Sequence, residues 1–455
     1  MFLFAAKINL INHLVLVFVL LVCCGNPGVH AQKACQFARF CVCKTVPGSE
    51  LLVANCDGRN LFRVPRMPNF VQDLSLQKNY ISIIEDGIFE ENNLLKSLDL
   101  SFNRIKQIRN QSFKGLHNLV HLDLSNNNLN YENISFDSAS FYFLENLKSL
   151  NLKINSNTPF VPDLSKLKSL ETLSMDFISD KTAILDEKFL YCKNLSIIDL
   201  SGFTGNCKLN VLTSETFLFL PQITHLNISK CQIQYIYIGT FTNMKNIYEL
   251  DVSLNTCLGF DALENITTDL QYSARKILKV NYIHGIFAMS PILKTSHIWY
   301  LNKTSLVRIE AAGNRIQRIE SGALEYFPHS FESGNFRDNV FSIGKYLFDL
   351  MSMCITFLDV SESFSSHNIF TSYIEECIAS EDTVRMKSEN NWIDEVSLYV
   401  KTKSKDSDFI IPVPNKLKTF LMSSSTLKYE ISKISFTENE LNSLSFSNNV
   451  LYTWT

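Results

Sequence analysis

The stretch 119–129, LVHLDLSNNNL, constrains the fold of this chain more than any other. Its residues follow the order L-x-x-L-x-L-x-x-N-x-L, which is the signature of a leucine-rich repeat. Leu122 and Leu124 alternate with Asp123 as in a short strand, so the leucines point inward and the Asp points out. At Asn127, where the strand ends, an inward amide both donates and accepts hydrogen bonds. The stretch therefore predicts one turn of a coil whose neighbours share buried peptide groups.

The same eleven-residue pattern recurs upstream as VQDLSLQKNYI and LKSLDLSFNRI. Its asparagines, Asn79, Asn103 and Asn127, are separated by 24 residues, a spacing within the range of this repeat class. Behind each strand a phenylalanine returns, as at Phe89 and Phe113. One aromatic side chain per turn predicts a stacked row along the back of the coil.

The repeats continue with looser spacing and predict an α/β fold. We expect a leucine-rich-repeat solenoid, curved like a horseshoe, with a concave parallel β-sheet. Turns near Ile277 and Val384 are required by spacing, which gives about fifteen turns in a solenoid domain spanning residues 66–455. Other strands are expected to begin at Leu147, Leu170, Leu195, Ile223, Ile247, Leu306, Phe331, Ile355, Leu417 and Leu441.

Residues 1–31 have the pattern of a secretory signal peptide. Lys7 supplies a basic start, residues 14–22 form an apolar run, and Val29-His30-Ala31 resembles a cleavage site. An N-terminal membrane anchor is the alternative, which the shortness of the run disfavours. We therefore expect a chain of the secretory pathway, extracellular or at the cell surface, where thiols oxidise and pair.

Residues 32–65 are predicted to form an N-terminal cap closed by disulfides. A solenoid exposes the apolar face of its first turn, and a small cysteine-rich cap covers such a face. A zinc site is the alternative, but the C-x-C spacing without a nearby His differs from zinc patterns, so no metal site is expected. The cluster C-x5-C-x-C-x12-C consists of Cys35, Cys41, Cys43 and Cys56.

Six further cysteines lie within the repeats. Two pairs are argued from register, because each joins cysteines at matching places in successive turns, and the third follows by elimination. Connectivity cannot be read from sequence alone, so these pairs are hypotheses. They are Cys354 with Cys377, Cys231 with Cys257, and Cys192 with Cys207.

Six N-x-S/T sequons are candidate glycosylation sites in this compartment. Asn227 is the informative one, because it lies between inward Leu226 and Ile228 and so points to the concave face. A glycan there would keep large partners off that patch. The six sites are Asn110, Asn133, Asn194, Asn227, Asn265 and Asn302.

Motifs of catalysis are missing from the sequence. There is no G-x-S-x-G, P-loop, H-E-x-x-H or Rossmann glycine pattern. His121 and His225 are lone residues of the strands, a poor basis for catalysis. We expect no enzyme, no catalytic residues and no cofactor. An outward Asp recurs with the repeat and with a Ser two residues later, which favours a structural role over acid catalysis or cation binding, at Asp99, Asp123, Asp199, Asp251 and Asp359.

The signal peptide, the cysteine cap, the 24-residue repeats and the irregular central turns together resemble the ectodomains of Toll-like receptors. The segments 200–221 and 244–267 are similar to those of invertebrate, particularly molluscan, members. The resemblance implies innate immune pattern recognition, with signalling by ligand-induced dimerisation. It also implies a C-terminal cap, a membrane helix and a TIR domain, none of which the sequence shows, so a truncated receptor chain is expected.

Binding is the function left to such a coil, since a rigid sheet presents an ordered surface to a ligand. The implied partners are a microbial or endogenous protein ligand and a second receptor ectodomain, as homo- or heterodimer. With 42 basic and 45 acidic residues, the formal net charge of −3 predicts no nucleic acid partner. A secreted decoy or matrix-adhesion protein is the competing hypothesis. Candidate contacts are the loops 283–302 and 392–408 and, on the sheet, Lys148, Lys153, Glu171, Asp176, Lys230, Tyr248 and Glu249.

Overall fold

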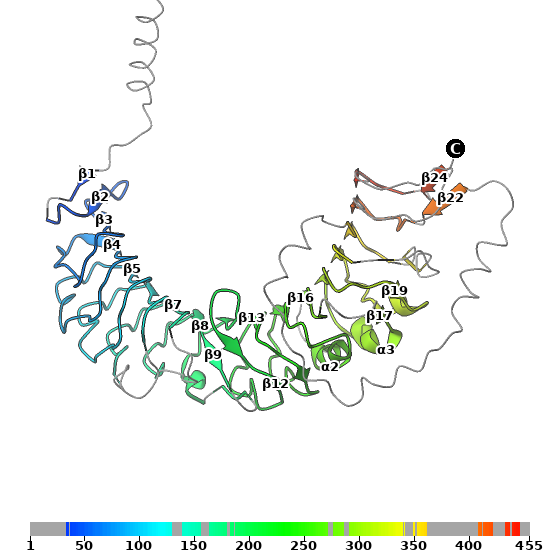
Figure 1. Ribbon diagram of the computed structural model, residues 1–455, viewed down its shortest axis with the longest axis horizontal. Coiled ribbons are helices and arrows are strands. Elements are labelled where there is room, and N and C mark those ends of the chain that lie inside the picture. Colours follow the sequence, from blue (N-terminus) through cyan, green and yellow to red (C-terminus); the bar gives the residue numbers. More distant parts are fainter. Residues whose placement is uncertain are drawn as a thin grey trace, which may run out of the picture.

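The described residues of the computed structural model form one curved solenoid with a β-sheet along its inner side (Figure 1). This arrangement confirms the predicted leucine-rich-repeat horseshoe. The signal peptide predicted for residues 1–31 lies outside the described part. The structure describes residues 33–35, 37–129, 139–155, 163–179, 183–185, 187–271, 276–285, 291–339, 341, 349–350, 353–361, 408–411, 413–421, 433–436 and 439–445.

The N-terminal cap is a small antiparallel unit stacked on the first turn. Strand β2 (Val42–Thr45) pairs with both β1 (Lys33–Ala34) and β3 (Leu52–Asn55), and β3 continues in parallel into the solenoid sheet. Disulfides Cys35–Cys43 and Cys41–Cys56 close the unit. The predicted cysteine cap is therefore confirmed.

The solenoid sheet is parallel from β4 onward. From β4 to β8, the inward leucine of each strand is the register partner of the inward leucine of the next strand. A strand lies near each of the ten starting residues expected after the first three repeats, and another is found in the turn near Ile277. The strands are β4 (Val71–Ser75), β5 (Ser97–Asp99), β6 (His121–Asp123), β7 (Ser149–Leu152), β8 (Thr172–Met175), β10 (Ile197–Asp199), β13 (His225–Asn227), β15 (Glu249–Asp251), β16 (Ile277–Lys279), β18 (Arg308–Glu310), β20 (Ser333–Asn335), β21 (Phe357–Asp359), β23 (Thr419–Leu421) and β25 (Ser443–Ser445).

The turn expected near Val384 adds no strand to this sheet. Phe357 of β21 pairs directly with Thr419 of β23, so the two strands are neighbours. Val384 itself lies outside the described residues. Spacing alone placed a strand there, but a strand can enter the sheet only between two partners that do not already bond to each other.

The outer side of the coil carries short strands and helices. No described helix is long and apolar enough to cross a membrane. Paired strands are β9 (Phe177–Ile178) with β11 (Cys207–Lys208), β12 (Val211–Leu212) with β14 (Tyr235–Ile236), β17 (Ile292–Leu293) with β19 (Arg318–Ile319), and β22 (Asp408–Ile411) with β24 (Lys433–Phe436). The helices are α2 (Asp261–Leu270), α3 (Thr295–Ile298), η1 (Glu187–Tyr191), η2 (Leu301–Lys303) and η3 (Ala323–Tyr326).

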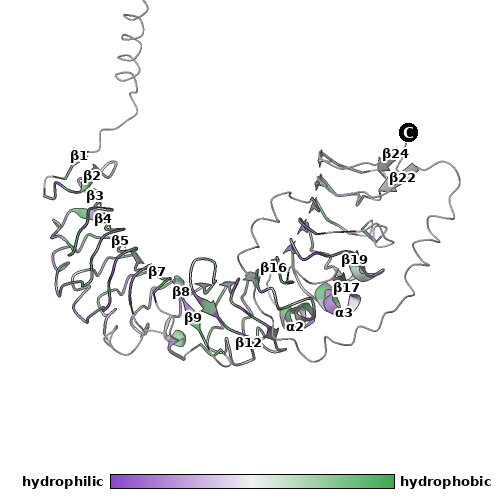
Figure 2. Ribbon diagram, viewed as in Figure 1, coloured by the Kyte–Doolittle hydropathy of each residue, from purple (hydrophilic) through white to green (hydrophobic). Residues whose placement is uncertain are grey.

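Apolar side chains fill the space between the sheet and the outer side, and ribbons coloured by hydropathy show hydrophobic residues in the strands alternating with hydrophilic ones (Figure 2). A row of buried phenylalanines follows the back of the coil, as the sequence predicts. The rings of Phe113 and Phe141 stack at 6.4 Å, and those of Phe217 and Phe241 at 5.8 Å. Each turn thus packs on its neighbours rather than on a separate core.

Asparagine side chains join successive turns by hydrogen bonds. Asn103 Nδ2 donates to the carbonyl of Leu76 in the preceding turn at 2.8 Å and to its own turn, while its Oδ1 accepts the N–H of Ile81 at 3.1 Å. Both groups are buried, and buried backbone groups require partners. The N–H of Ile81 relies on this amide, whereas the carbonyl of Leu76 also accepts from Asn79 Nδ2. The same ladder includes Asn79, Asn127, Asn155, Asn255, Asn314 and Asn339.

This geometry overturns the pairings expected for the repeat cysteines. A side chain at the asparagine position reaches back to the preceding turn, so Cys231 bonds to Cys207 rather than forward to Cys257. Cys257 is disulfide-bonded in another pair. The Cys192–Cys207 pairing is therefore wrong as well, and Cys192 is a buried free thiol.

The Cys354–Cys377 pairing is also not formed, because Cys354 is a free and exposed thiol. Cys377 lies outside the described residues. This pair could form only if the two cysteines stood in successive turns. The direct pairing of β21 with β23 removes that condition.

Candidate ligand-binding surface

The outward Asp column has a structural role. In β6, Asp123 Oδ1 accepts the backbone N–H of Ser125 at 2.8 Å, which closes a short turn where the strand ends. The remaining column members bind their serines in the same way, at Asp99, Asp199, Asp251 and Asp359. Within the described residues no cluster of His, Cys, Asp and Glu fits a metal ion. The column therefore shapes the sheet surface and is not a reaction centre.

A hollow of about 520 Å³ opens at the edge where strands β5 to β8 begin. Three of its lining side chains are apolar, and the other five are two amides, two lysines and a serine. Such a composition suits a ligand with apolar groups and a negative charge. The lining residues are Leu51, Leu94, Lys96, Asn118, Val120, Asn146, Lys148 and Ser169.

One of the predicted contact residues, Lys148, lines this hollow, and another, Glu171, pairs with it. Lys148 Nζ lies 2.7 Å from Glu171 Oε1, and both side chains are about half exposed. Lys96 occupies the corresponding place two turns earlier and has no ion-pair partner among the described residues. Sequence reasoning missed Lys96, although the shared L-K-S-L context of Lys96 and Lys148 was a signal that could have found it.

Two other predicted contacts, Lys153 and Asp176, are not on the surface. Each is only 3% exposed. Both follow their strands at the place where the chain turns, and the loop 202–206 covers them. A Cβ on Gly205 of that loop would clash with the side chains of Asp176 and Lys153, so a larger residue would have to displace these side chains. The prediction was wrong because charge on a repeat surface does not reveal a covering loop.

Buried Lys153 takes the place of the asparagine ladder where the ladder is interrupted. Three successive turns carry Ile178, Phe203 and Cys231 at the asparagine position. Lys153 Nζ instead donates to the carbonyl of Ser201 at 2.5 Å and lies 3.3 Å from Asp199 Oδ1. Burial lowers the pKa of Lys153, while Asp199 and Asp176 oppose that shift.

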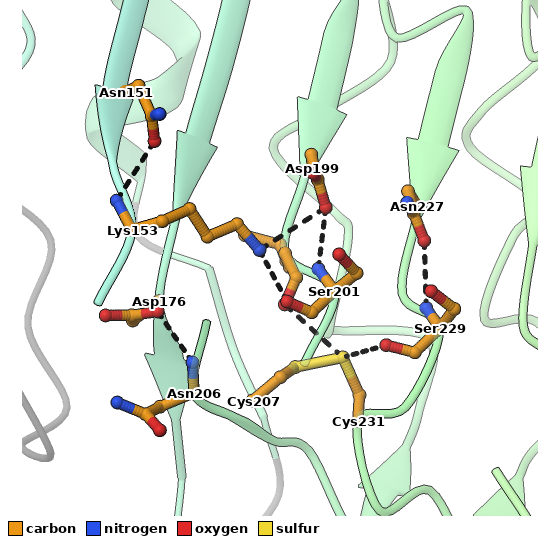
Figure 3. Close-up of polar contacts among 11 residues, drawn as sticks. Asn151, Lys153, Asp176, Asp199, Ser201, Asn206, Cys207, Asn227, Ser229 and Cys231 are labelled. Carbon is orange, nitrogen blue, oxygen red and sulfur yellow. Dashed lines mark hydrogen bonds and ion pairs between the residues drawn. A yellow bond between two sulfur atoms is a disulfide. The ribbon is translucent and has the colours of Figure 1, made fainter. Parts of the chain in front are cut away.

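The Asp176 carboxylate completes the substitute ladder. It accepts the backbone N–H of Asn155 at 2.9 Å and that of Asn206 at 2.7 Å. The disulfide Cys207–Cys231 then fixes the far end of the loop (Figure 3). The centre of the solenoid is therefore held by ionic and covalent bonds instead of amides.

The remaining predicted contacts lie farther along the concave face. Tyr248 is 42% exposed, and its ring lies 5.5 Å from that of His225. Glu249 pairs with Lys279 at 2.5 Å. Lys230 has a left-handed backbone, with φ of 53°, in the turn after β13. Glu249 lies on β15, the strand next to β13, which carries Asn227, and none of Lys230, Tyr248 and Glu249 lines the hollow.

Five of the six sequons fall within the described residues. Asn110, Asn194 and Asn302 are exposed, whereas Asn227 and Asn265 are partly buried. Asn133 lies outside the described part. The two candidate loops, 283–302 and 392–408, are described only in part, at 283–285, 291–302 and Asp408.

The family model described as "Leucine rich repeat" matches residues 71–129. "Toll-like receptor 4" from Pinctada imbricata is 29% identical over 343 residues, which is 75% of this chain but 37% of that protein. "Osteomodulin" from Bos taurus is 29% identical, covering 60% of this chain and 66% of that protein. The chain thus spans little more than a third of the receptor it matches.

Among solved structures, Toll in the Drosophila Toll–Spätzle complex superposes with a TM-score of 0.52 at 15% identity, over 85% of this chain and 49% of that chain. This likeness concerns the fold. Together with the repeat pattern, the disulfide cap and the similarity to the Pinctada receptor, it agrees with a non-enzymatic extracellular coil. The chain therefore has the leucine-rich-repeat fold and is similar in sequence to a Toll-like receptor.

Proposed function

We propose that this chain is the ligand-binding portion of a Toll-like receptor that acts in innate immune pattern recognition. A microbial molecule or an endogenous protein ligand would bring two ectodomains together and so start signal transduction. The observation that carries this proposal is the hollow at the beginning of β5 to β8, since it joins apolar walls to a lysine without an ion-pair partner among the described residues.

The ligand class follows from the lining of the hollow. Leu94 is 42% exposed and lies next to Lys96, so an apolar group and an anionic group of one ligand would bind side by side. Lys148 is already neutralised by Glu171, which leaves Lys96 as the stronger anion-binding group of the two. An anionic amphiphile of microbial origin, or a protein segment with an acidic residue beside an apolar one, fits this surface.

The scaffold supports such binding because it is ordered in advance. The strands under the hollow are joined by the ladder of Asn103, Asn127 and Asn155. Little conformational entropy is lost when a ligand meets a surface of this kind.

The test is a fusion of the chain to the membrane helix and TIR domain of a Toll-like receptor, expressed with an NF-κB reporter. Heat-killed Gram-negative and Gram-positive bacteria serve as the probes. We expect reporter activation that the charge reversal Lys96→Glu reduces at least tenfold. The matched control is Lys78→Glu, an exposed lysine one turn earlier, which lies outside the hollow and is expected to keep the response.

Equal responses of the two variants would contradict the hollow as the binding site. A fusion that reaches the cell surface but responds to neither probe, while the unfused chain promotes cell attachment, would contradict the receptor function itself. Surface staining before stimulation separates these outcomes from failure to fold.

The alternative is a secreted leucine-rich-repeat decoy or matrix-adhesion protein without signalling of its own. The match to osteomodulin, which covers 66% of that protein, is the observation in its favour. Attachment of cells to a surface coated with the purified chain, unchanged by Lys96→Glu, would support this alternative.

A further inference from the structure

We propose that Asn227 carries an N-linked glycan on the concave face, whereas Asn265 remains unmodified in the folded protein. A sugar is attached through Nδ2 of asparagine, so a sequon in a folded chain is compatible with a glycan only if that nitrogen is not needed inside. The two partly buried sequons differ in this respect, and the difference comes from hydrogen bonds rather than from exposure.

Asn265 uses its amide nitrogen inside the fold. Its Nδ2 donates to the carbonyl of Ile236 at 2.8 Å and so ties α2 to β14. The neighbouring residues Ile266 and Thr267 are buried against the sheet. A glycan replaces one of the two Nδ2 hydrogens and would place sugar between helix and strand. The sugar would separate Nδ2 from the Ile236 carbonyl, at a cost comparable to losing a buried hydrogen bond and its packing.

Asn227 uses only its oxygen. Its Oδ1 accepts the backbone N–H of Ser229 at 3.0 Å, the same bond that the Asp side chains of neighbouring strands make. The amide carbonyl survives glycosylation, so a sugar on Nδ2 leaves this turn intact. No hydrogen bond of Asn227 Nδ2 to another described residue is found, and the side chain points from the strand to the concave face.

Comparison with another asparagine of the sheet shows that its Nδ2 does take part in a hydrogen bond. Asn151 occupies the corresponding place in β7 and also accepts the backbone N–H two residues later. Its Nδ2, however, donates to Asp123 Oδ2 at 2.9 Å. At Asn227 the flanking register partners are Asp199 and Asp251, each bound to its own serine.

The position of the glycan decides which part of the concave face is open. Parallel strands are about 4.8 Å apart, and Asp251 is the direct register partner of Asn227. Glu249 lies two residues earlier on the same adjacent strand, opposite His225, and so within reach of a glycan on Asn227. Tyr248 precedes Glu249 and would be covered too. The hollow near Lys96 lies several strands away and stays open. The glycan thus removes Tyr248 and Glu249 from the ligand surface and, if the proposed function holds, confines the ligand to the N-terminal half.

The test uses the full chain secreted from cultured eukaryotic cells. Enzymatic deglycosylation in H₂¹⁸O converts each glycosylated Asn to ¹⁸O-labelled Asp, which peptide mass spectrometry locates. We expect label at Asn227 and none at Asn265, with exposed Asn110 as the positive control. Asn227→Gln should lower the intact mass by one glycan, whereas Asn151→Gln, which is outside any sequon, should leave the glycan mass unchanged.

Label at Asn110 without label at Asn227 would overturn the proposal, and so would label at Asn265 in the secreted protein. Hydroxyl-radical footprinting adds a readout of coverage. Oxidation of Tyr248 should rise at least threefold in Asn227→Gln or after deglycosylation of the native protein, and an unchanged rate would show that the glycan does not cover the sheet. None of these results depends on ligand binding, so they are independent of the receptor assay.

Discussion

Lys153 and Asp199 stand two strands apart in the sheet, yet Lys153 Nζ lies 3.3 Å from Asp199 Oδ1. The lysine crosses the intervening turn beneath a loop and donates to Ser201 at the far side. This contact spans the interruption of the asparagine ladder. A single long side chain therefore connects the two regular halves of the solenoid.

Removal of this side chain should weaken the centre of the coil. We expect Lys153→Ala to lower the free energy of unfolding by about 3 kcal/mol, because it leaves a cavity and an unpaired carboxylate. Lys153→Met fills the cavity but also removes the ammonium from Asp199 and Ser201, so it should cost about 2 kcal/mol, less than Lys153→Ala. Lys148→Ala is the matched control, since its exposed ion pair should contribute under about 1 kcal/mol. Urea unfolding followed by circular dichroism measures all three, and equal losses for Lys153→Ala and Lys148→Ala would contradict the prediction.

The asparagine ladder predicts a large effect of one amide. Asn103→Ala leaves the carbonyl of Leu76 and the N–H of Ile81 without this partner, so a loss of about 3 kcal/mol is expected. Asn128→Ala alters an exposed asparagine one turn later and should change stability by under about 0.5 kcal/mol. The midpoint of urea unfolding distinguishes the two variants. Similar midpoints would contradict a stabilising role of the buried Asn103 amide.

Two glycines with left-handed backbones differ in what surrounds them. Gly115 has φ of 97°, and a Cβ there would lie 2.3 Å from the carbonyl oxygen of Phe89, whereas at Gly48, with φ of 76°, nothing lies within 4 Å. Gly48→Ala should cost about 1 kcal/mol from backbone strain alone. Gly115→Ala should cost roughly 3 kcal/mol or more, because the turns must also separate. Thermal melting of both variants is the measurement, and a Gly115→Ala melt at or above that of Gly48→Ala would be the contrary result.

Acid should destabilise the region around His284. Burial lowers the pKa of His284 to about 4 from 6.5, and its Nδ1 has no hydrogen-bond partner among the described residues. Between these values the unfolded chain binds the proton and the folded chain does not. Stability from this group is therefore complete above pH 6.5 and is lost as the pH falls, on the order of 3 kcal/mol by pH 4.

The pH prediction for His284 is tested by measuring the free energy of unfolding in urea at pH 7, 5.5 and 4. His284→Phe, which keeps a ring against Phe260, should show a flatter decline than the parent chain. His121→Phe changes an exposed histidine and should keep the parental slope. Parallel declines for the parent chain and His284→Phe would remove His284 as the cause.

The two free thiols of the described residues should react at very different rates. Cys354 is exposed, whereas burial raises the pKa of Cys192 to about 11, and the thiolate is the reactive form. Ellman's reagent should label Cys354 within minutes and Cys192 only after unfolding.

Peptide mapping without reduction should recover Cys207 linked to Cys231, and recovery of Cys231 linked to Cys257 would contradict the structure.

The sequence by itself determined the repeat. The period of 24 residues between Asn79, Asn103 and Asn127 predicted the coil, because each of these side chains meets the same neighbours one turn away. The alternation of leucine with outward residues predicted the sheet and its concave face. Local periodicity is sufficient for such features, since every turn contacts only adjacent turns.

Tertiary structure alone decided what departs from the repeat. Lys153 and Asp176 read as surface charges, and only the covering loop 202–206 shows them to be buried. The partner of Cys231 depended on the direction in which its side chain leaves the backbone, which spacing does not encode. The hollow around Lys96 is likewise made by side chains from several turns. Each of these features brings together residues that are not separated by a constant number of residues. A repeat period in the sequence therefore cannot predict them.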